Sequence, residues 1–142
     1  VVAAESAKFK LVFGPQLGII PDVGSSWFVP HLIGRARANG MGLLGDDIMA
    51  KEAKEWGLIW DYFPDDEFMD AVSDLAERIA KGPIAGLKAV VKAYDHALST
   101  TLDKQLDYER DIQEIFLDRE EFREGVKAFI EKRKPDFKSI KT

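Results

Sequence analysis

The sequence feature that most constrains the fold is a series of four helical patterns that follow one another from Asp65 onward. In each pattern, apolar residues recur three or four positions apart, as they do on one face of an α-helix. The breaks are short: Pro83 opens the second pattern, Thr101 opens the third, and Pro135 lies beyond the last. Four amphipathic helices need a large apolar surface to cover, which is provided either by one another or by a second subunit.

The first 64 residues contain shorter segments and more turn signals. Residues 8–13 alternate as a half-buried strand does, and residues 58–63 form the other strand candidate. A strand needs partners, so we expect the sheet that contains residues 8–13 to be incomplete and an upstream segment to be missing. Glycines and prolines mark a loop over residues 14–24, and helices are expected from Ser25 or Ser26 to about Ile33, over residues 35–44 and over residues 50–56. The predicted class is α/β, mostly helical, with a strand-loop-helix part at 1–64 and a helical layer at 65–142.

Composition argues against several classes of protein. The chain has 142 residues, 46% of them hydrophobic and 32% charged, which fits one ordinary globular domain. The net charge is −5 and basic residues are scattered among acids, so nucleic acid is not expected as a partner. With no cysteine and two distant histidines, no metal site is expected. No apolar run approaches the ~20 residues that span a bilayer, so we expect no membrane association and a cytoplasmic location.

The sequence contains none of the GxGxxG, GxxxxGK[ST], GxSxG or HExxH motifs, which leaves carboxylates and backbone groups as the candidates for chemistry. The most distinctive carboxylate is Asp22 in the stretch GIIPDVGSSWF. No other Asp or Glu lies between Glu5 and Asp22, and the neighbours are apolar or aromatic, so we expect a partly desolvated side chain suited to proton transfer. The alternative is a helix cap, since Asp is preferred there and Gly-Ser-Ser follows. The two roles do not exclude each other.

Other side chains have ordinary structural interpretations. The three tryptophans, Trp27 among them, are expected in the core, although they are also able to line a ligand pocket. The two histidines have no acidic or nucleophilic partner at a recognisable spacing, which favours a surface or packing role. The cluster formed by Lys132, Arg133 and Lys134 is typical of a solvated chain end, or alternatively of a clamp for a phosphate group.

Two stretches carry a family resemblance. The string GIIPDVGSSWFVPHLIGRARANGMGLLGDDIMAKEAKEWGLIWDYFPDDEF resembles the enoyl-CoA hydratase/isomerase (crotonase) superfamily, in which a GxxPxxG loop leads through a helix to a short strand. EGVKAFIEKRKPDF, residues 124–137, looks like the C-terminal signature of that family. The resemblance corresponds to the second half of such a protein. It implies the end of a crotonase-type ββα spiral with the active-site loop at 1–64, followed by a helical oligomerisation layer at 65–142 that builds trimers or dimers of trimers (hexamers).

Within the superfamily, the strongest likeness is to the isomerases that act on 2-(1,2-epoxy-1,2-dihydrophenyl)acetyl-CoA in phenylacetate degradation. Their loop also reads Pro-Asp, and the Asp is the acid/base, which the resemblance places on Asp22. Hydratases of the superfamily instead use two glutamates. One would lie upstream of Val1, and the other shortly before the GxxP loop, where this chain has Val12 to Pro15. The resemblance therefore implies an acyl-CoA isomerase that shifts a double bond or isomerises a ring epoxide, with an enoyl-CoA hydratase as the alternative.

The resemblance also implies the ligand and the partners. The substrate is an acyl-CoA thioester, so coenzyme A is part of the substrate and no separate cofactor is expected. Pro21, Gly24 and Trp27 are the expected substrate-binding neighbours of Asp22, while Phe129 and Lys132 approach the CoA of an adjacent subunit of a homo-oligomer. The backbone N–H groups that hold the enolate oxygen in this family lie upstream of Val1. The 142 residues alone are therefore expected to be inactive, or to form a non-catalytic, CoA-contacting assembly domain.

Overall fold

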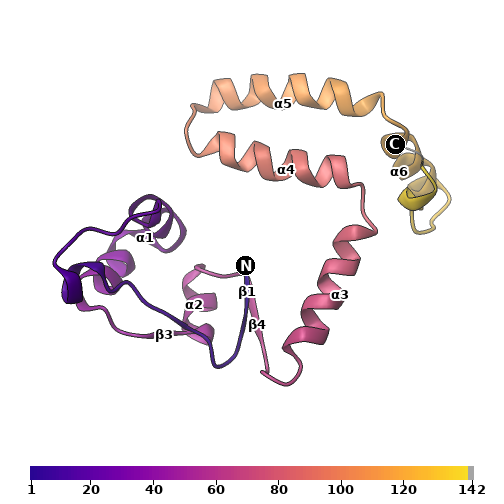
Figure 1. Cartoon of the computed structure of the whole chain (residues 1–142). Helices are drawn as coiled ribbons and strands as arrows, with labels where there is room; N and C mark the ends of the chain where they lie inside the picture. The colour runs from indigo at the N-terminus through magenta and orange to yellow at the C-terminus, as the bar shows by residue number, and fades with distance from the viewer. Residues whose placement is uncertain (141–142) are drawn as a thin grey trace. The chain divides into compact units, whose positions relative to one another are not determined.

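The structure, a computed structural model, describes residues 1–140 and divides into two compact units, Val1–Ser73 and Asp74–Thr142. Figure 1 traces the elements along the chain. The boundary lies inside helix α3 (Phe68–Ala80), which runs from the first unit into the second. The predicted division of roles between residues 1–64 and 65–142 remains a prediction.

The strands of the first unit form two short pairs. Strand β1 (Val2–Ala4) pairs in parallel with β4 (Asp61–Phe63), and β2 (Lys8–Phe9) pairs antiparallel with β3 (Ile48–Met49). The strand predicted over residues 8–13 is therefore reduced to two residues, and the partner it has, β3, was not predicted. The chain leaves the sheet because residues 13–17 turn into a single helical turn, η1 (Phe13–Leu17).

Glycines punctuate the helices of the first unit. Helix α1 (Ser25–Leu44) contains a kink at Gly34, whose φ of 76° and ψ of 156° are not helical, so it consists of the two helices that the sequence predicts. It ends at Gly45 with φ of 68°. Helix α2 (Ala50–Trp56) also agrees with the prediction and ends at Gly57, whose φ is 84°. Both end residues adopt the left-handed conformation that glycine enters without steric penalty.

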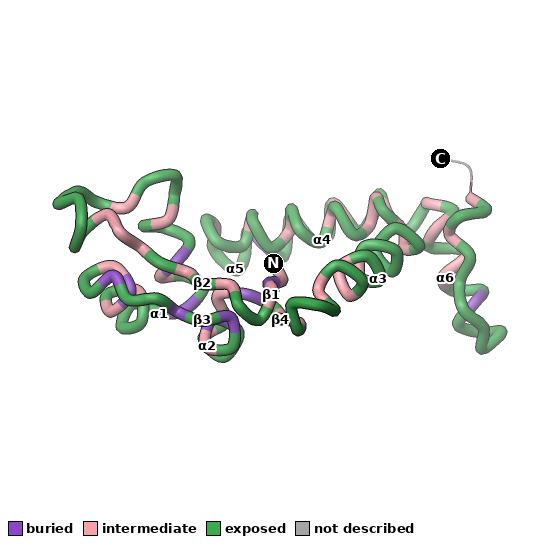
Figure 2. Tube along the Cα trace, turned by 60° about the horizontal axis from the view of Figure 1, so that its bottom comes forward, coloured by how far each residue is buried: buried purple, intermediate pink, exposed green. Residues whose placement is uncertain are grey.

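The buried core lies in the first unit, around β1, β3, α1 and α2. Figure 2 shows the buried residues concentrated there. The buried cluster consists of Ala3, Val29, Ile33, Met41, Ile48, Ala50, Ala53 and Ile59. Trp56 is half-buried against this cluster, as predicted for a core residue. The same prediction is wrong for Trp27 and Trp60, which are 50% and 61% exposed, because neither is among the side chains that pack against the buried cluster.

The second unit is helical. After α3 come α4 (Ile84–Ala97), α5 (Leu102–Leu117) and α6 (Glu120–Ile130), in agreement with the four predicted helical patterns. A turn of 3-10 helix, η2 (Phe137–Ser139), which was not predicted, follows α6. Helices α4 and α5 lie side by side as an antiparallel hairpin (Figure 1). The hairpin is joined by the buried Gln105, which donates a hydrogen bond to Ala93 O (3.2 Å) and lies 2.7 Å from His96 Nδ1. Apolar side chains such as Val91, Leu102 and Ile115 remain exposed.

None of the helices within residues 1–140 combines the length and the apolar character that a membrane crossing needs. In the same part of the chain, no group of three or more histidine and carboxylate side chains is placed to hold a metal ion.

Candidate active site

The loop that carries Asp22 is built from residues in unusual backbone conformations. Gly18, which ends η1, and Gly24, which precedes α1, have φ of 67° and 79°. Between them, Val23 has φ of 51°, although a β-branched side chain strongly disfavours the left-handed region. The Gly14 end of the loop passes close to α1, because a Cβ on Gly14 would lie 2.9 Å from the Gly42 carbonyl oxygen. The loop is therefore held against α1 and strained beside its acid.

Asp22 is fixed through its backbone, and its side chain does not cap α1. The Asp22 carbonyl oxygen accepts hydrogen bonds from Ser25 N (2.9 Å) and Ser25 Oγ (2.6 Å). The N-cap residue of α1 is Gly24, and no side chain makes a capping hydrogen bond there. The cap interpretation of Asp22 is therefore wrong, because the chain enters the helix through a left-handed glycine. Within residues 1–140, no hydrogen bond or ion pair engages the Asp22 carboxylate.

The Asp22 side chain is exposed, which contradicts the expected desolvation. Pro21 is half-buried, but the other apolar neighbours in sequence are exposed as well, and Val23 has 95% of its surface accessible. The expectation fails because the apolar side chains near Asp22 in the sequence are largely exposed themselves, so they do not enclose the carboxylate. What the structure provides at this position is an accessible carboxylate on a fixed backbone.

A cavity of about 570 Å³ lies beside the loop, between it and α1. The loop contributes Ile19, Ile20 and Pro21 to its lining. Helix α1 contributes apolar residues together with the polar Ser25, Ser26 and Asn39 and the charged Arg35. An apolar cavity with a few polar groups is the usual form of a small-molecule site. Asp22 itself is not among the lining residues, but it is the next residue after Pro21, which is one of them.

Gly24 and Trp27, the other two predicted neighbours of Asp22, shape the start of α1. A Cβ on Gly24 would lie 3.0 Å from the Phe28 ring, so a side chain there would displace that ring. The Trp27 ring lies 4.3 Å, centroid to centroid, from the ring of His31, and His31 Nδ1 lies 2.7 Å from Trp27 O. His31 therefore has the packing role that the sequence favours. Pro21, Asp22, Gly24 and Trp27 lie along one segment that leads from the loop into α1.

Phe129 and Lys132, the remaining predicted site residues, lie together at the end of α6 in the second unit. The Lys132 N–H donates to Phe129 O at 3.3 Å, and Lys132 has φ of 54°. The Arg133 N–H donates to Ala128 O at 3.0 Å. These two bonds form a Schellman motif, in which the left-handed position is usually glycine. Phe129 is 85% exposed.

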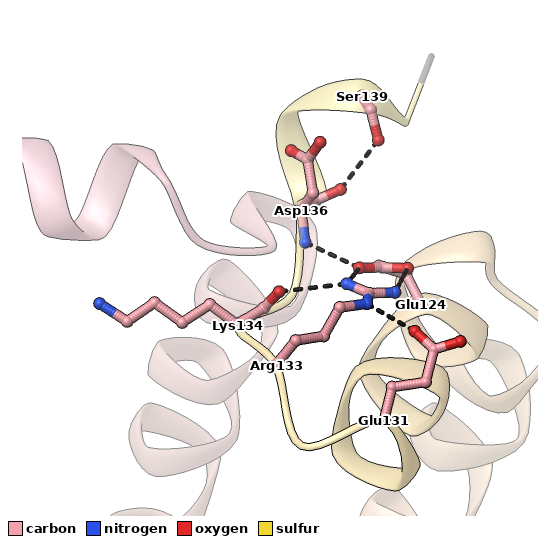
Figure 3. A network of polar contacts seen from close by, with 6 residues as sticks. All are labelled: Glu124, Glu131, Arg133, Lys134, Asp136 and Ser139. Carbon is pink, nitrogen blue, oxygen red and sulfur yellow. Dashed lines mark hydrogen bonds and ion pairs between the residues drawn. The ribbon is translucent and has the colours of Figure 1, made fainter.

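A polar cluster behind this turn was not predicted as such, and Figure 3 shows it. Arg133 makes two parallel contacts to Glu124, Nη1 to Oε1 at 2.6 Å and Nη2 to Oε2 at 3.0 Å. The Asp136 N–H donates to Glu124 Oε1 at 2.8 Å. Arg133, and after it this N–H group, lower the pKa of the Glu124 carboxyl to about 2, and Glu124 in turn raises the pKa of Arg133. The pairing of Glu124 with Arg133 could not be predicted from their spacing of nine residues, because it depends on the turn that follows α6.

Comparison with known proteins identifies the family. The model of the enoyl-CoA hydratase/isomerase family matches residues 1–140. The chain belongs to the enoyl-CoA hydratase/isomerase family. Among relatives of this family, it is 45% identical over 137 residues to the 1,2-epoxyphenylacetyl-CoA isomerase of Escherichia coli K12, covering 96% of this chain and 52% of that protein. It is 43% identical to a probable enoyl-CoA hydratase of Rhodobacter capsulatus, covering 96% of this chain and 53% of that protein.

Solved structures of the family share the fold. The enoyl-CoA hydratase subunit I of Geobacillus kaustophilus superposes with a TM-score of 0.90 at 31% identity, over 96% of this chain and 52% of that one. The predicted fold, part of a crotonase-type spiral followed by helices, is thereby confirmed. The chain spans about half the length of the relatives it matches.

Proposed function

We propose that the protein is an acyl-CoA isomerase in which Asp22 is the general acid/base. The observation that carries the proposal is that no other acidic residue lies near this carboxylate in the sequence. Between residues 6 and 45, Asp22 is the only Asp or Glu in the sequence, and it sits on a backbone fixed by Ser25 beside an apolar cavity. The 45% identity to an epoxyphenylacetyl-CoA isomerase supports the same assignment.

The chemistry follows from what one carboxylate is able to do. A CoA thioester acidifies the proton on its α-carbon, provided that preorganised donors hold the enolate oxygen. A single carboxylate then takes a proton from one carbon and returns it to another, which moves a double bond. We assign the donors for the enolate oxygen to sequence outside these 142 residues. Pro21, Gly24 and Trp27 are assigned to the acyl side, and Phe129 and Lys132 to the CoA of an adjacent subunit.

Enoyl-CoA hydration is the second candidate, because one relative at 43% identity is named a probable enoyl-CoA hydratase. Adding water needs groups that both position the water and deliver a proton. Residues 12–15, where hydratases of the superfamily are expected to carry a glutamate, hold no carboxylate and form the start of η1. This difference favours isomerisation.

The test is the Asp22→Asn variant of the protein as expressed from its natural gene. Asparagine keeps the shape of the side chain but does not exchange protons, so we expect isomerase kcat to fall about 10²- to 10⁴-fold with little change in KM. Asp46→Asn, an exposed aspartate just past α1, is the matched control and should retain activity. Wild-type turnover in Asp22→Asn would refute the proposal. Hydration of crotonyl-CoA at a rate above isomerisation would favour the second candidate.

A further inference from the structure

The three consecutive basic residues Lys132, Arg133 and Lys134 are not equivalent in the structure. Arg133 is fully engaged: it contacts Glu124 with both terminal nitrogens, donates from Nε to Glu131 Oε2 at 2.6 Å, and donates to Lys134 O at 3.1 Å. Within residues 1–140, no ion pair is recorded for the ammonium groups of Lys132 and Lys134. Figure 3 shows the Lys134 side chain extending away from the cluster. One cation is thus used internally and two remain available to an anionic ligand.

The contacts of Glu124 also fix the backbone of the turn that follows α6. Glu124 lies in α6 and receives both the Arg133 guanidinium and the Asp136 N–H, so one carboxylate joins the helix to the chain on both sides of Pro135. Its side chain is only 17% exposed. Bidentate arginine-carboxylate pairs fix orientation as well as distance. We call Glu124 and Arg133 the clasp.

Lys132 lies on the segment that the clasp closes. Its φ of 54° puts a residue with a Cβ where glycine is usual in a Schellman turn, at a cost of about 1–2 kcal/mol. Strained conformations of this kind persist where the surroundings over-determine them, and they cluster at ligand sites. The backbone of Lys132 is held by its bond to Phe129 O on one side and by the clasped Arg133 on the other.

We propose that the clasp of Glu124 and Arg133 is a positioning device that holds Lys132 in the orientation in which its ammonium group binds a phosphate of the CoA thioester. The inference rests on the proposed function, because it takes Lys132 as a CoA-binding residue. Glu124 itself does not touch the ligand. It acts through Arg133 and the turn, and it prevents Arg133 from competing with Lys132 for the phosphate.

Whether Glu124→Gln strengthens or weakens the binding of coenzyme A distinguishes a positioning role from simple electrostatic attraction. Glu124→Gln removes a negative charge near the proposed phosphate, and Coulomb attraction alone would then tighten the binding of an anion. If the clasp positions Lys132, the same variant weakens binding, by roughly tenfold for the loss of one charge-assisted hydrogen bond. Arg133→Lys, which keeps the charge but loses the bidentate geometry, is expected to weaken binding similarly. It also keeps the test available if Glu124→Gln does not fold.

The measurement is the dissociation constant of coenzyme A, by isothermal titration calorimetry on the protein as its natural gene encodes it. The probe pantetheine, which has no phosphate, should bind all variants alike. The variant Lys132→Ala should weaken coenzyme A binding, and Glu124→Gln added to Lys132→Ala should weaken it no further, because the clasp acts through Lys132. Glu120→Gln, which breaks the exposed pair of Glu120 with Arg123 on the same helix, should change nothing.

The outcomes distinguish this inference from the proposed function. If Lys132→Ala weakens coenzyme A binding while Glu124→Gln and Arg133→Lys bind as the wild type does, the clasp proposal is overturned and the CoA assignment of Lys132 stands. If Lys132→Ala binds normally, that assignment fails and the clasp proposal fails with it. Additive effects of Glu124→Gln and Lys132→Ala would also overturn it, since they would mean a general structural role. None of these results depends on the role of Asp22.

Discussion

Replacing Val23 by glycine should make the protein more stable and less active. Val23 has φ of 51°, and a left-handed conformation costs an L-residue about 1–2 kcal/mol. Its side chain is 95% exposed, so removing it sacrifices almost no buried apolar surface. Glycine raises the conformational entropy of the unfolded chain, which offsets roughly 0.4–1 kcal/mol of the gain. The net expectation for Val23→Gly is a free energy of unfolding higher by about 0.5–1 kcal/mol.

The assay is urea unfolding followed by circular dichroism, with thermal unfolding as a second measurement. A gain of this size should raise the Tm by about 1–4 °C. Val23→Ala is the matched control, because alanine also removes the exposed methyl groups but keeps the Cβ that causes the strain. A Val23→Gly protein no more stable than Val23→Ala would refute the reasoning.

The activity of the same variants tests whether the strain serves Asp22. A glycine lets the loop sample other conformations, so the Asp22 carboxylate spends less time in the productive geometry. We expect kcat of Val23→Gly to fall by about tenfold while Val23→Ala stays near the wild type, since small misplacements of a reacting group lower rates strongly. If Val23→Gly is more stable but has the kcat of the wild type, the strain at Val23 has no role in positioning Asp22.

Two further predictions concern the second unit. The folded-state pKa of Glu124 is about 2, below its ordinary value of 4.5, so its pairing stabilises the protein above pH 4.5 and this contribution is lost as the pH falls from 4.5 toward 2. The difference in unfolding free energy between wild type and Glu124→Gln should therefore narrow over that range; a difference independent of pH would contradict the pairing. Gln105→Met should lower the stability by about 1–2 kcal/mol, because His96 Nδ1 and Ala93 O lose a partner inside the α4–α5 hairpin. Gln105→Glu keeps an acceptor for His96, but it places a second carboxylate beside Glu109 Oε1, which lies 3.4 Å from Gln105 Nε2, and leaves Ala93 O without its donor. It should therefore lose at least as much stability as Gln105→Met, and a Gln105→Glu protein that unfolds in denaturant as the wild type does would contradict this.

Most helices were predictable from the sequence because their signals are local. Apolar spacing, prolines at helix starts and glycines after helix ends located α2 to α6 within a few residues, and the kink of α1 was predicted from Gly34. The strands were less predictable. Strands β1 and β3 have two or three residues each and exist because distant segments pair with them, which no short pattern announces. Strand β2 is shorter than predicted because its distant partner, β3, pairs with it over two residues only.

The sequence by itself determined the family, the helical elements and the isolation of Asp22, because motifs, periodicity and the absence of neighbouring acids are properties of the order of residues. Only the tertiary structure decided that Asp22 is exposed and does not cap α1, that Val23 is strained, and that Arg133 is engaged while Lys132 adopts a left-handed conformation. Side-chain environment and backbone conformation depend on which distant groups meet. A carboxylate nine residues from an arginine becomes its partner only when the helix between them ends in a turn.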